Sequence, residues 1–396
     1  MSFDNLSIIH NQYPILESNE FPLVSIVVPA YNAQQYIGPT LQSLIRQSYP
    51  HLEIIVIDDG SCDRTAEIVK SAMIKDTRIK LLQQSNCGVA AARNLAIQQS
   101  RGSFIAPVDA DDICFPDKIA KLLDGLQKAG TRAGLAYSWY VTINQQGNLI
   151  GKSRRFEFDG EIFEYLLFSN FIGNASSVLI RKNCFDAVGL YETSFFLQKA
   201  QGCEDYDMHL RIAEKFECKL IREFLTGYRK TGHSMSDNYK AMERSRELVF
   251  RNQKIRNPWI PAVVFNWAFA YYFLWLSSLA ANKGCYYDYL IYLARAAHHD
   301  PLLTKNTGFL RLFFKPLKRG LKNMVSLFCT RDNKKVSLKN PQQPIMVKGD
   351  ISEKDFEKTS DFNPKKSSLT LLKEHRRMIA YQLVKNAGIK NVHRAR

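Results

Sequence analysis

Four segments of the sequence place carboxylates or turn-forming residues directly after an apolar run. They are Val27 to Asn32, Ile57 to Ser61, Pro107 to Asp112 and Cys203 to Asp207. The carboxyl ends of parallel strands meet at one edge of an α/β sheet, so we expect these segments to converge there. Acidic side chains at such an edge suit a metal ion that carries a phosphorylated ligand. The sequence therefore predicts a single site for a metal-bound nucleotide.

Asp109 and Asp111 have the spacing of a metal-binding Asp-x-Asp pair. Alternate side chains at a strand end point the same way, and Mg²⁺ or Mn²⁺ binds through one or two carboxylates plus phosphate oxygens. The same residues also fit an ordinary acidic loop in which Asp112 caps the next helix. The spacing by itself leaves both interpretations open.

Other polar residues near these strand ends have two interpretations each. Asp58 or Asp59 could accept a hydrogen bond from a base edge, with Tyr31 stacked on the base, although turn formation also explains an aspartate there. Arg93 could face a diphosphate or pair with an aspartate of the site. Asp205 opens a helix, where the dipole favours an acid whatever its function.

Strands and helices alternate along the first 130 residues. Short, β-branched apolar runs are typical of strands buried on both faces of a parallel sheet. We expect strands at 23–28, 52–57, 79–82 and 104–108, and helices at 34–47, from Ser61 or Asp63 onward, at 89–98 and at 118–128. Strands at 134–141 and 177–180 and a helix at 204–215 should follow. This is the doubly wound arrangement of a nucleotide-binding α/β domain.

The character of the chain changes after Tyr228. A charged helix is expected at 242–256, and residues 259–281 contain no charged side chain and are long enough to span a bilayer. Because polar residues dilute this stretch and a second helix follows at 286–297, we prefer a buried antiparallel helix pair. The amphipathic segment 311–328 suits a helix at a membrane interface or one docked on its own protein. A polar linker and a last helix at 369–385 complete the prediction.

Positive charge is concentrated in the C-terminal part of the chain. Of the net charge of +16 over 396 residues, +14 belongs to residues 311–396, which contain 21 Lys and Arg against 7 Asp and Glu. An anionic partner should therefore meet this tail. No basic motif interleaved with aromatic residues indicates RNA or DNA, so we expect an anionic membrane surface and no nucleic acid.

The cysteines and the N-terminus point to the cytoplasm. The eight cysteines include no C-x-x-C pair and no cluster, so neither a zinc site nor a disulfide framework is predicted. The start, Met1 to Asn5, lacks the basic and apolar regions of a secretory signal. We expect a cytoplasmic protein, peripheral on the cytoplasmic face of a membrane.

Five segments, taken in order, resemble the family 2 inverting glycosyltransferases. They are Ser25 to Asn32, Val56 to Ser61, Gly88 to Asn94, Val108 to Asp112 and Glu204 to Arg211, and the resemblance covers about residues 22–240. It implies the GT-A fold, a Rossmann-like, mainly parallel sheet flanked by helices. An α-helical C-terminal region and a basic tail follow in this chain.

The resemblance assigns donor-binding roles to matching residues. Tyr31 and Asp58 or Asp59 would hold the nucleobase, Arg93 would face the diphosphate, and Asp109 would bind the ribose. Pro29 would also belong to the donor-binding residues. The implied donor is a nucleoside-diphosphate sugar, with UDP or dTDP preferred over GDP.

The resemblance also implies metal, catalytic and acceptor residues. Asp111 would bind Mn²⁺ or Mg²⁺, with Asp109 and His233 as further candidate ligands. His233 departs from the family pattern, because the family's histidine position two residues after Arg229 holds Thr231 here. Asp205 would be the general base that activates the acceptor hydroxyl, and the acceptor side would include Asn174 and Glu204.

The implied product is a polysaccharide, a glycolipid or a glycosylated protein, made on a glycan, lipid-linked or protein acceptor. Two alternatives come from other classes. A dinucleotide-dependent oxidoreductase is disfavoured because no G-x-G-x-x-G follows the first strand. A non-catalytic, membrane-associated nucleotide-sugar-binding or adapter protein acting through the basic tail stays open.

These observations divide the chain into five regions. We expect an N-terminal extension at 1–21, the catalytic domain at 22–240, a helical extension at 241–305, a basic amphipathic segment at 306–330, and a flexible basic tail with a final helix at 331–396.

Overall fold

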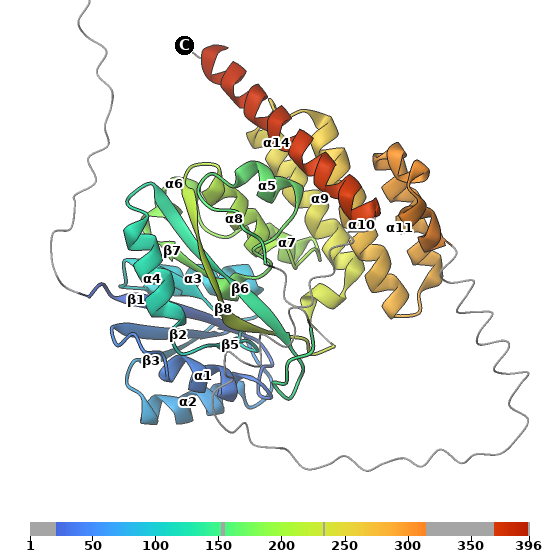
Figure 1. Cartoon of the computed structure of the whole chain (residues 1–396). Coiled ribbons are helices and arrows are strands. Elements are labelled where there is room, and N and C mark those ends of the chain that lie inside the picture. Colours follow the sequence, from blue (N-terminus) through green and yellow to red (C-terminus); the bar gives the residue numbers. More distant parts are fainter. Residues whose placement is uncertain (1–20, 152–154, 233, 314–367, 395–396) are drawn as a thin grey trace, which may run out of the picture.

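A mixed eight-stranded β-sheet forms the centre of the computed structural model, which describes residues 21–151, 155–232, 234–313 and 368–394 (Figure 1). The strand order is β3-β2-β1-β4-β7-β6-β8-β5. The strands are β1 (Val24–Ala30), β2 (Leu52–Asp58), β3 (Ile79–Gln83), β4 (Phe104–Pro107), β5 (Ile113–Cys114), β6 (Ala133–Ile143), β7 (Val178–Arg181) and β8 (Glu217–Arg229).

The N-terminal half of the sheet is parallel. β2 pairs with β1 and β3, and β1 with β4, all in the same direction. β7 then runs antiparallel to β4 and β6, while β6 and β8 pair in parallel. The expected α/β fold with a mainly parallel sheet is confirmed, and the carboxyl ends of β1, β2 and β4 meet at one edge.

Helices cover both faces of the sheet. In β1 and β2 alternate side chains enter two separate cores, because successive residues of a strand point to opposite faces. One core includes side chains of α1 (Ile37–Ile45), α2 (Thr65–Lys75) and α4 (Lys118–Lys128). The other includes side chains of α3 (Val89–Gln99), α5 (Phe163–Phe168), α6 (Asn183–Val188), α7 (Ser194–Leu197) and α8 (Glu204–Ala213).

The structure differs from the sequence-based expectation in several places, and the short strand β5 and the helices α5, α6 and α7 are among the elements that were not predicted. β8 was not predicted, because its exposed stretch carries Lys219, Arg222 and Glu223 and interrupts the apolar pattern. The alternative in which Asp112 caps the next helix is wrong, since α4 begins at Lys118 and Asp112 is fully buried. The alternation of strands and helices up to residue 128 is confirmed.

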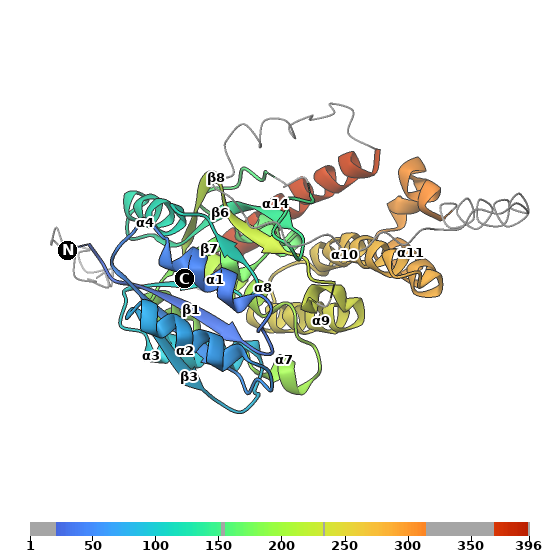
Figure 2. The ribbon, with the colours of Figure 1, turned by 90° about the horizontal axis from the view of Figure 1, so that it is seen from below.

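Three helices follow the sheet and lie on one side of it (Figures 1 and 2). They are α9 (Tyr239–Arg256), α10 (Ala262–Asn282) and α11 (Tyr286–His299). The predicted helix pair is confirmed, because α10 packs along α11 across a short turn at residues 283–285. Within the described residues, α10 is the one helix long and apolar enough to cross a membrane, and 56% of its most apolar window is buried inside the protein.

The last described helix, α14 (Ser368–Arg394), packs on the same side and contacts α5 and α10 (Figure 1). It confirms the helix predicted at 369–385 and extends it at both ends. Residues 307–313 are helical as well, whereas most of the predicted amphipathic segment and the linker lie outside the described residues.

A buried ion pair anchors α14. Arg376 donates to both carboxylate oxygens of Asp300, at 2.8 and 3.1 Å, and its guanidinium lies 4.3 Å from the centre of the Trp267 ring. Asp300 is fully buried and the Arg376 side chain is 12% exposed. The pair therefore fixes the tail helix to the body of the protein.

We expect Arg376→Met to release α14. The substitution strands a buried carboxylate, at a cost of about 3 kcal/mol. Hydrogen exchange of the α14 amides should become about a hundredfold faster. Lys385→Met, an exposed position on the same helix, should leave exchange unchanged. Unchanged protection of α14 in Arg376→Met would contradict the anchoring role.

Candidate active site

One large cavity, of about 2160 Å³, opens at the carboxyl edge of the parallel strands. Nine of the predicted site residues line it: Pro29, Tyr31, Asp59, Arg93, Asp109, Asp111, Asn174, Glu204 and Asp205. Asp58 does not line it, and His233 lies outside the described residues. The structure thus brings together residues that are more than 170 positions apart in the sequence.

The two aspartates after β2 have different surroundings. Asp58 accepts hydrogen bonds from the Ser61 amide at 3.0 Å and from Gln83 at 2.9 Å, so both of its oxygens are used within the fold. Both oxygens of Asp59 are also used, because they accept hydrogen bonds from the amides of Cys87 and Gly88, both at 2.9 Å, and from the Gln84 side chain at 2.7 Å. Asp59 lines the cavity and Asp58 does not, so Asp59 is the better placed of the two alternatives to meet a ligand, and its two amide bonds also fix the start of α3.

The backbone at the start of α3 is constrained to glycine at position 88. Gly88 has a φ of 89°, and a Cβ at this position would lie 2.7 Å from the Phe196 ring, so both the backbone and the space require glycine. This turn places Arg93, one turn further along α3, beneath the cavity. Tyr31, in contrast, is 52% exposed and lies at the cavity wall, where its ring face is available for stacking.

Arg93 forms the central ion pair of the site. It is 3% exposed and donates to Asp109 at 2.5 Å, and its guanidinium lies 5.3 Å from the centre of the Tyr191 ring. It also interacts electrostatically with Asp205. Its Nε atom has no hydrogen-bond partner. Of the two interpretations of Arg93, the structure shows the ion pair with an aspartate of the site. Arg93 also lines the cavity.

The Asp-x-Asp loop is held by Arg229, the last residue of β8. The Arg229 amide donates to Asp112 at 2.9 Å, and its guanidinium donates to the carbonyl oxygens of Asp111, Asn144 and Gln145. Burial, together with the charge of Asp109, raises the pKa of Asp111 to about 6. Burial also raises the pKa of Asp112, whose Oδ2 atom has no partner.

This loop has the donor chemistry of a divalent-cation site. Among the described residues no group of three or more His, Cys, Asp or Glu side chains forms a complete metal site. Mg²⁺ and Mn²⁺ bind through one or two carboxylates completed by phosphate oxygens, and Asp111 with Asp109 supplies such a pair. A cation would also offset the repulsion that raises the Asp111 pKa.

The N-terminus of α8 presents Glu204 and Asp205 to the cavity. Burial raises the pKa of Asp205 to about 7; Arg93 opposes this shift, while Asp109 and Glu204 add to it. Glu204 is 2% exposed, its pKa is raised by burial, and its Oε1 atom has no partner. A carboxylate that is half protonated near neutral pH is suited to general-base work.

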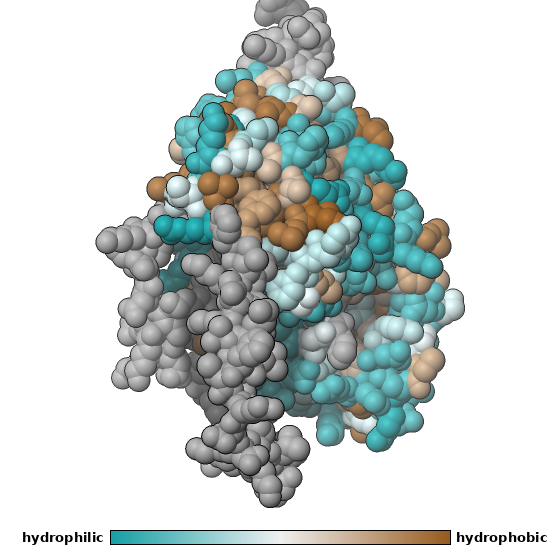
Figure 3. Space-filling model, turned by 90° about the vertical axis from the view of Figure 1, so that its right-hand side faces the viewer, coloured by the Kyte–Doolittle hydropathy of each residue, from teal (hydrophilic) through white to brown (hydrophobic). Residues whose placement is uncertain are grey.

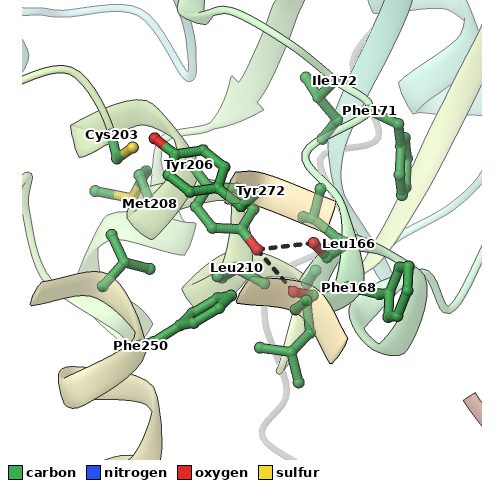
Figure 4. Close-up of a cluster of buried hydrophobic side chains, with 14 of the residues drawn as sticks. Leu166, Phe168, Phe171, Ile172, Cys203, Tyr206, Met208, Leu210, Phe250 and Tyr272 are labelled. Atoms are coloured by element: carbon green, nitrogen blue, oxygen red, sulfur yellow. Dashed lines mark hydrogen bonds between the residues drawn. The ribbon is translucent and has the colours of Figure 1, made fainter. Parts of the chain in front are cut away.

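Neighbouring elements fix α8 in place. The Tyr206 hydroxyl donates to the carbonyl oxygens of Leu166 and Leu167 in α5, at 2.9 and 3.0 Å (Figure 4). Asp207 pairs with Arg211 at 2.8 Å and with Arg256 of α9 at 3.0 Å. The acids of this first turn are also favoured by the helix dipole, as expected for a helix start.

Asn174, predicted for the acceptor side, has an Nδ2 atom without a hydrogen-bond partner.

Several other residues that line the cavity were not predicted from the sequence. The C-terminal helices contribute Arg246, Tyr271, Tyr272, Trp275, Lys373 and Arg377, which no motif indicated. Arg229 does not itself line the cavity, and its role in holding the Asp-x-Asp loop was not predicted, because in the sequence it served only as the reference point for the family's histidine position.

A model of glycosyl transferase family 2 matches residues 25–189. A glycosyltransferase of Methanocaldococcus jannaschii is 30% identical over 233 residues, which cover 57% of this chain and 76% of that protein. The chain therefore belongs to glycosyl transferase family 2, and it is a glycosyltransferase enzyme with the GT-A fold.

Larger relatives are matched over part of their length. The chondroitin synthase of Escherichia coli is 28% identical over 230 residues, 58% of this chain and 32% of that protein. The hyaluronan synthase of Pasteurella multocida is 27% identical over 245 residues, 61% of this chain and 24% of that protein. Among solved structures, a mannosyltransferase of Pyrobaculum calidifontis aligns with a TM-score of 0.48 and 19% identity, covering 78% of this chain and 86% of that chain.

We expect Asp111→Asn to abolish Mn²⁺-dependent binding of UDP, used here as the probe nucleotide. In the wild type, the affinity for UDP in the presence of Mn²⁺ should be constant above pH 6 and fall about tenfold per pH unit below it. The reason is that the metal binds the ionised form of Asp111, whose pKa is about 6. Isothermal titration calorimetry with Mn²⁺ and with chelator measures both effects. Asp124→Asn, on exposed α4 surface, should behave as wild type. Metal-dependent binding that survives Asp111→Asn would exclude Asp111 as a ligand.

Proposed function

We propose that the protein transfers a sugar from a nucleoside-diphosphate sugar to an acceptor hydroxyl by single displacement with inversion. The observation that carries the proposal is that one cavity contains both Asp205, with a pKa of about 7, and the Asp109-x-Asp111 pair. Arg93 interacts electrostatically with Asp109 and Asp205 and thus links the two parts of the site.

The donor would occupy the side of the cavity formed by the ends of β1, β2 and β4. Tyr31 offers an exposed ring to the base, and Asp59 offers a carboxylate to its edge. Arg93, paired with Asp109, would face the diphosphate and ribose. The preference for UDP or dTDP rests on the family resemblance.

Asp111, with Asp109, would hold Mn²⁺ or Mg²⁺, which stabilises the negative charge of the departing diphosphate when it is bound. Lys230, which also lines the cavity, interacts electrostatically with Asp111 and adds positive charge on this side. Arg229 holds the loop so that both carboxylates keep their positions without the ligand.

Asp205 would act as the general base. Its carboxylate takes the proton of the acceptor hydroxyl as the oxygen forms its bond to the anomeric carbon. The bond from that carbon to the diphosphate breaks at the same time, and its electron pair leaves with the diphosphate. Attack from the face opposite the leaving group inverts the configuration.

The acceptor would be a sugar of a growing polysaccharide or glycolipid. The support is that similar sequences include a chondroitin synthase and a hyaluronan synthase, together with a putative teichuronic acid biosynthesis glycosyltransferase of Bacillus subtilis that is 35% identical over 136 residues. The aligned regions cover only part of these relatives, so the acceptor of this chain is part of the proposal.

We expect Asp205→Asn to reduce kcat about a thousandfold while UDP binding is kept, because the amide cannot accept the proton. In the wild type, kcat/KM should fall about tenfold per pH unit below pH 7, where Asp205 becomes protonated. Coupled release of UDP measures turnover, and Asp186→Asn on exposed α6 surface serves as the matched control. Substantial turnover by Asp205→Asn would refute the assignment of the base.

We also propose that the protein works at the cytoplasmic face of a membrane. α11 and its surroundings expose Tyr286, Tyr287, Leu290, Ile291, Leu302 and Leu310, and the net charge of +14 follows in residues 311–396. Figure 3 faces this side of the molecule and shows apolar side chains gathered among hydrophilic ones. An exposed apolar surface that is followed along the chain by a strongly basic segment suits an anionic bilayer interface.

Vesicle co-sedimentation tests the membrane proposal. The protein should bind vesicles with anionic phosphatidylglycerol more tightly than neutral phosphatidylcholine vesicles. The double substitution Tyr287→Ser and Ile291→Ser should weaken binding about tenfold or more, because two apolar side chains no longer insert. Ile74→Ser, which removes an exposed apolar side chain from α2, should change nothing. Equal binding to both vesicle types would contradict the proposal.

A further inference from the structure

Part of the cavity is lined by the C-terminal helices, and we call this part the C-terminal arm. Its walls come from α9, α10 and α14, through Arg246, Tyr271, Tyr272, Trp275, Lys373 and Arg377. The nucleotide-side residues Tyr31, Asp59 and Asp111 belong to the opposite part of the cavity, at the ends of the parallel strands. Asp205 interacts electrostatically with Arg93 on the nucleotide side and with Cys203, which also interacts with Arg246 of the arm. Because the proposed base has neighbours in both parts, we place the C-terminal arm on the acceptor side of the proposed reaction.

Arg246 is a buried cation without an anionic partner. It is 6% exposed, and its guanidinium lies 3.9 Å from the centre of the Tyr206 ring, 4.4 Å from Tyr272 and 5.2 Å from Phe250. Figure 4 shows these three rings together in the core next to α8. Its Nε atom has no hydrogen-bond partner. Among the described residues, none of the ion pairs includes Arg246.

An unpaired charge in this position is costly. Aromatic faces stabilise a guanidinium only in part, and a buried charge is normally paired or bound to a ligand. Arg93, the other deeply buried arginine of the cavity, is paired with Asp109. Arg246 therefore has the properties of a residue whose anionic partner arrives with a ligand.

A second buried group in the arm is also unpartnered. The Tyr271 hydroxyl lacks a hydrogen-bond partner, although the residue is 6% exposed and lines the arm. Lys373 lies 5.8 Å from the centre of the Tyr271 ring, and Arg377 lies 5.0 Å from that of Phe158. One acid, Glu374, lines the arm as well. The arm thus combines a buried cation, two further cations and aromatic faces that can cover a sugar ring.

We infer that the C-terminal arm binds a negatively charged group of the acceptor saccharide, a carboxylate or a phosphate, on Arg246. The inference rests on the proposed glycosyltransferase reaction and adds to it the chemical class of the acceptor. An oxyanion would pair with the guanidinium in a charge-assisted hydrogen bond, and the tyrosine hydroxyl would donate to the same ligand. The aromatic residues of α10 would contact the sugar that carries the anion.

Binding to enzyme already saturated with UDP and Mn²⁺ tests the inference, because the nucleotide fills the donor side first. Three probes are titrated by calorimetry: a glucuronate-terminated disaccharide, its carboxyl-reduced neutral counterpart, and the same neutral disaccharide carrying a phosphate. At least one anionic probe should bind about tenfold or more tightly than the neutral disaccharide. The anionic probe that binds more tightly shows whether the acceptor carries a carboxylate or a phosphate.

Two substitutions assign the effect to Arg246. Arg246→Gln should remove the preference for the anionic probe, and Arg246→Lys, which keeps the charge, should restore part of it. Arg251→Gln, exposed on the same helix, should keep the full preference, and melting temperatures check that each variant is folded. Equal binding of all three probes, or an unchanged preference for the anionic probe in Arg246→Gln, would overturn the inference, provided that UDP and Mn²⁺ still bind. Failure of UDP and Mn²⁺ to bind at all would instead refute the proposed function.

Discussion

The arrangement of the cavity depends on the burial of several carboxylates around one arginine. Arg93 neutralises Asp109 directly, but the neighbouring acids are not neutralised to the same extent. Burial raises the pKa of four of them, Asp111, Asp112, Glu204 and Asp205. Such a cluster disfavours folding unless the surrounding structure holds it in place or a ligand offsets its charge. Both conditions apply here, because the supporting contacts are dense and the chemistry of the loop suits a divalent cation.

Three supports hold the cluster from different elements. Asp59 binds two backbone amides at the start of α3 and so positions Arg93. Arg229 binds the Asp-x-Asp loop from the end of β8. Tyr206 connects α8 to α5. Arg229 and Tyr206 support the site without lining the cavity, whereas Asp59 both supports it and lines the cavity, and the reactive carboxylates Asp111 and Asp205 remain on the cavity wall.

The sequence predicted the parts of the site that depend on local pattern. Strand topology brings Asp109 and Asp111, which follow β4, to one edge of the sheet, whereas Asp205 comes from the start of helix α8. The choice between Asp58 and Asp59 required the three-dimensional structure, because both follow the same strand and only Asp59 lines the cavity. β8 was missed because Arg222 and Glu223 in its middle are exposed and charged, which interrupts the apolar pattern of the strand.

The C-terminal contribution could not be read from the sequence for a different reason. Arg246 lies in a charged helix and resembles its exposed neighbours, and only tertiary packing shows that it is buried among aromatic rings. α14 was expected as part of a flexible tail, whereas it lines the cavity and is anchored through Arg376. Removal of α14 would therefore alter the cavity itself.

A crystal structure with UDP and Mn²⁺ bound tests the central claim most directly. The account predicts Mn²⁺ on Asp111, the diphosphate close to Arg93, and the uracil between Tyr31 and Asp59, with the C-terminal arm and Asp205 left open for the acceptor. A nucleotide bound elsewhere, or a diphosphate placed without contact to the Asp-x-Asp loop, would contradict it.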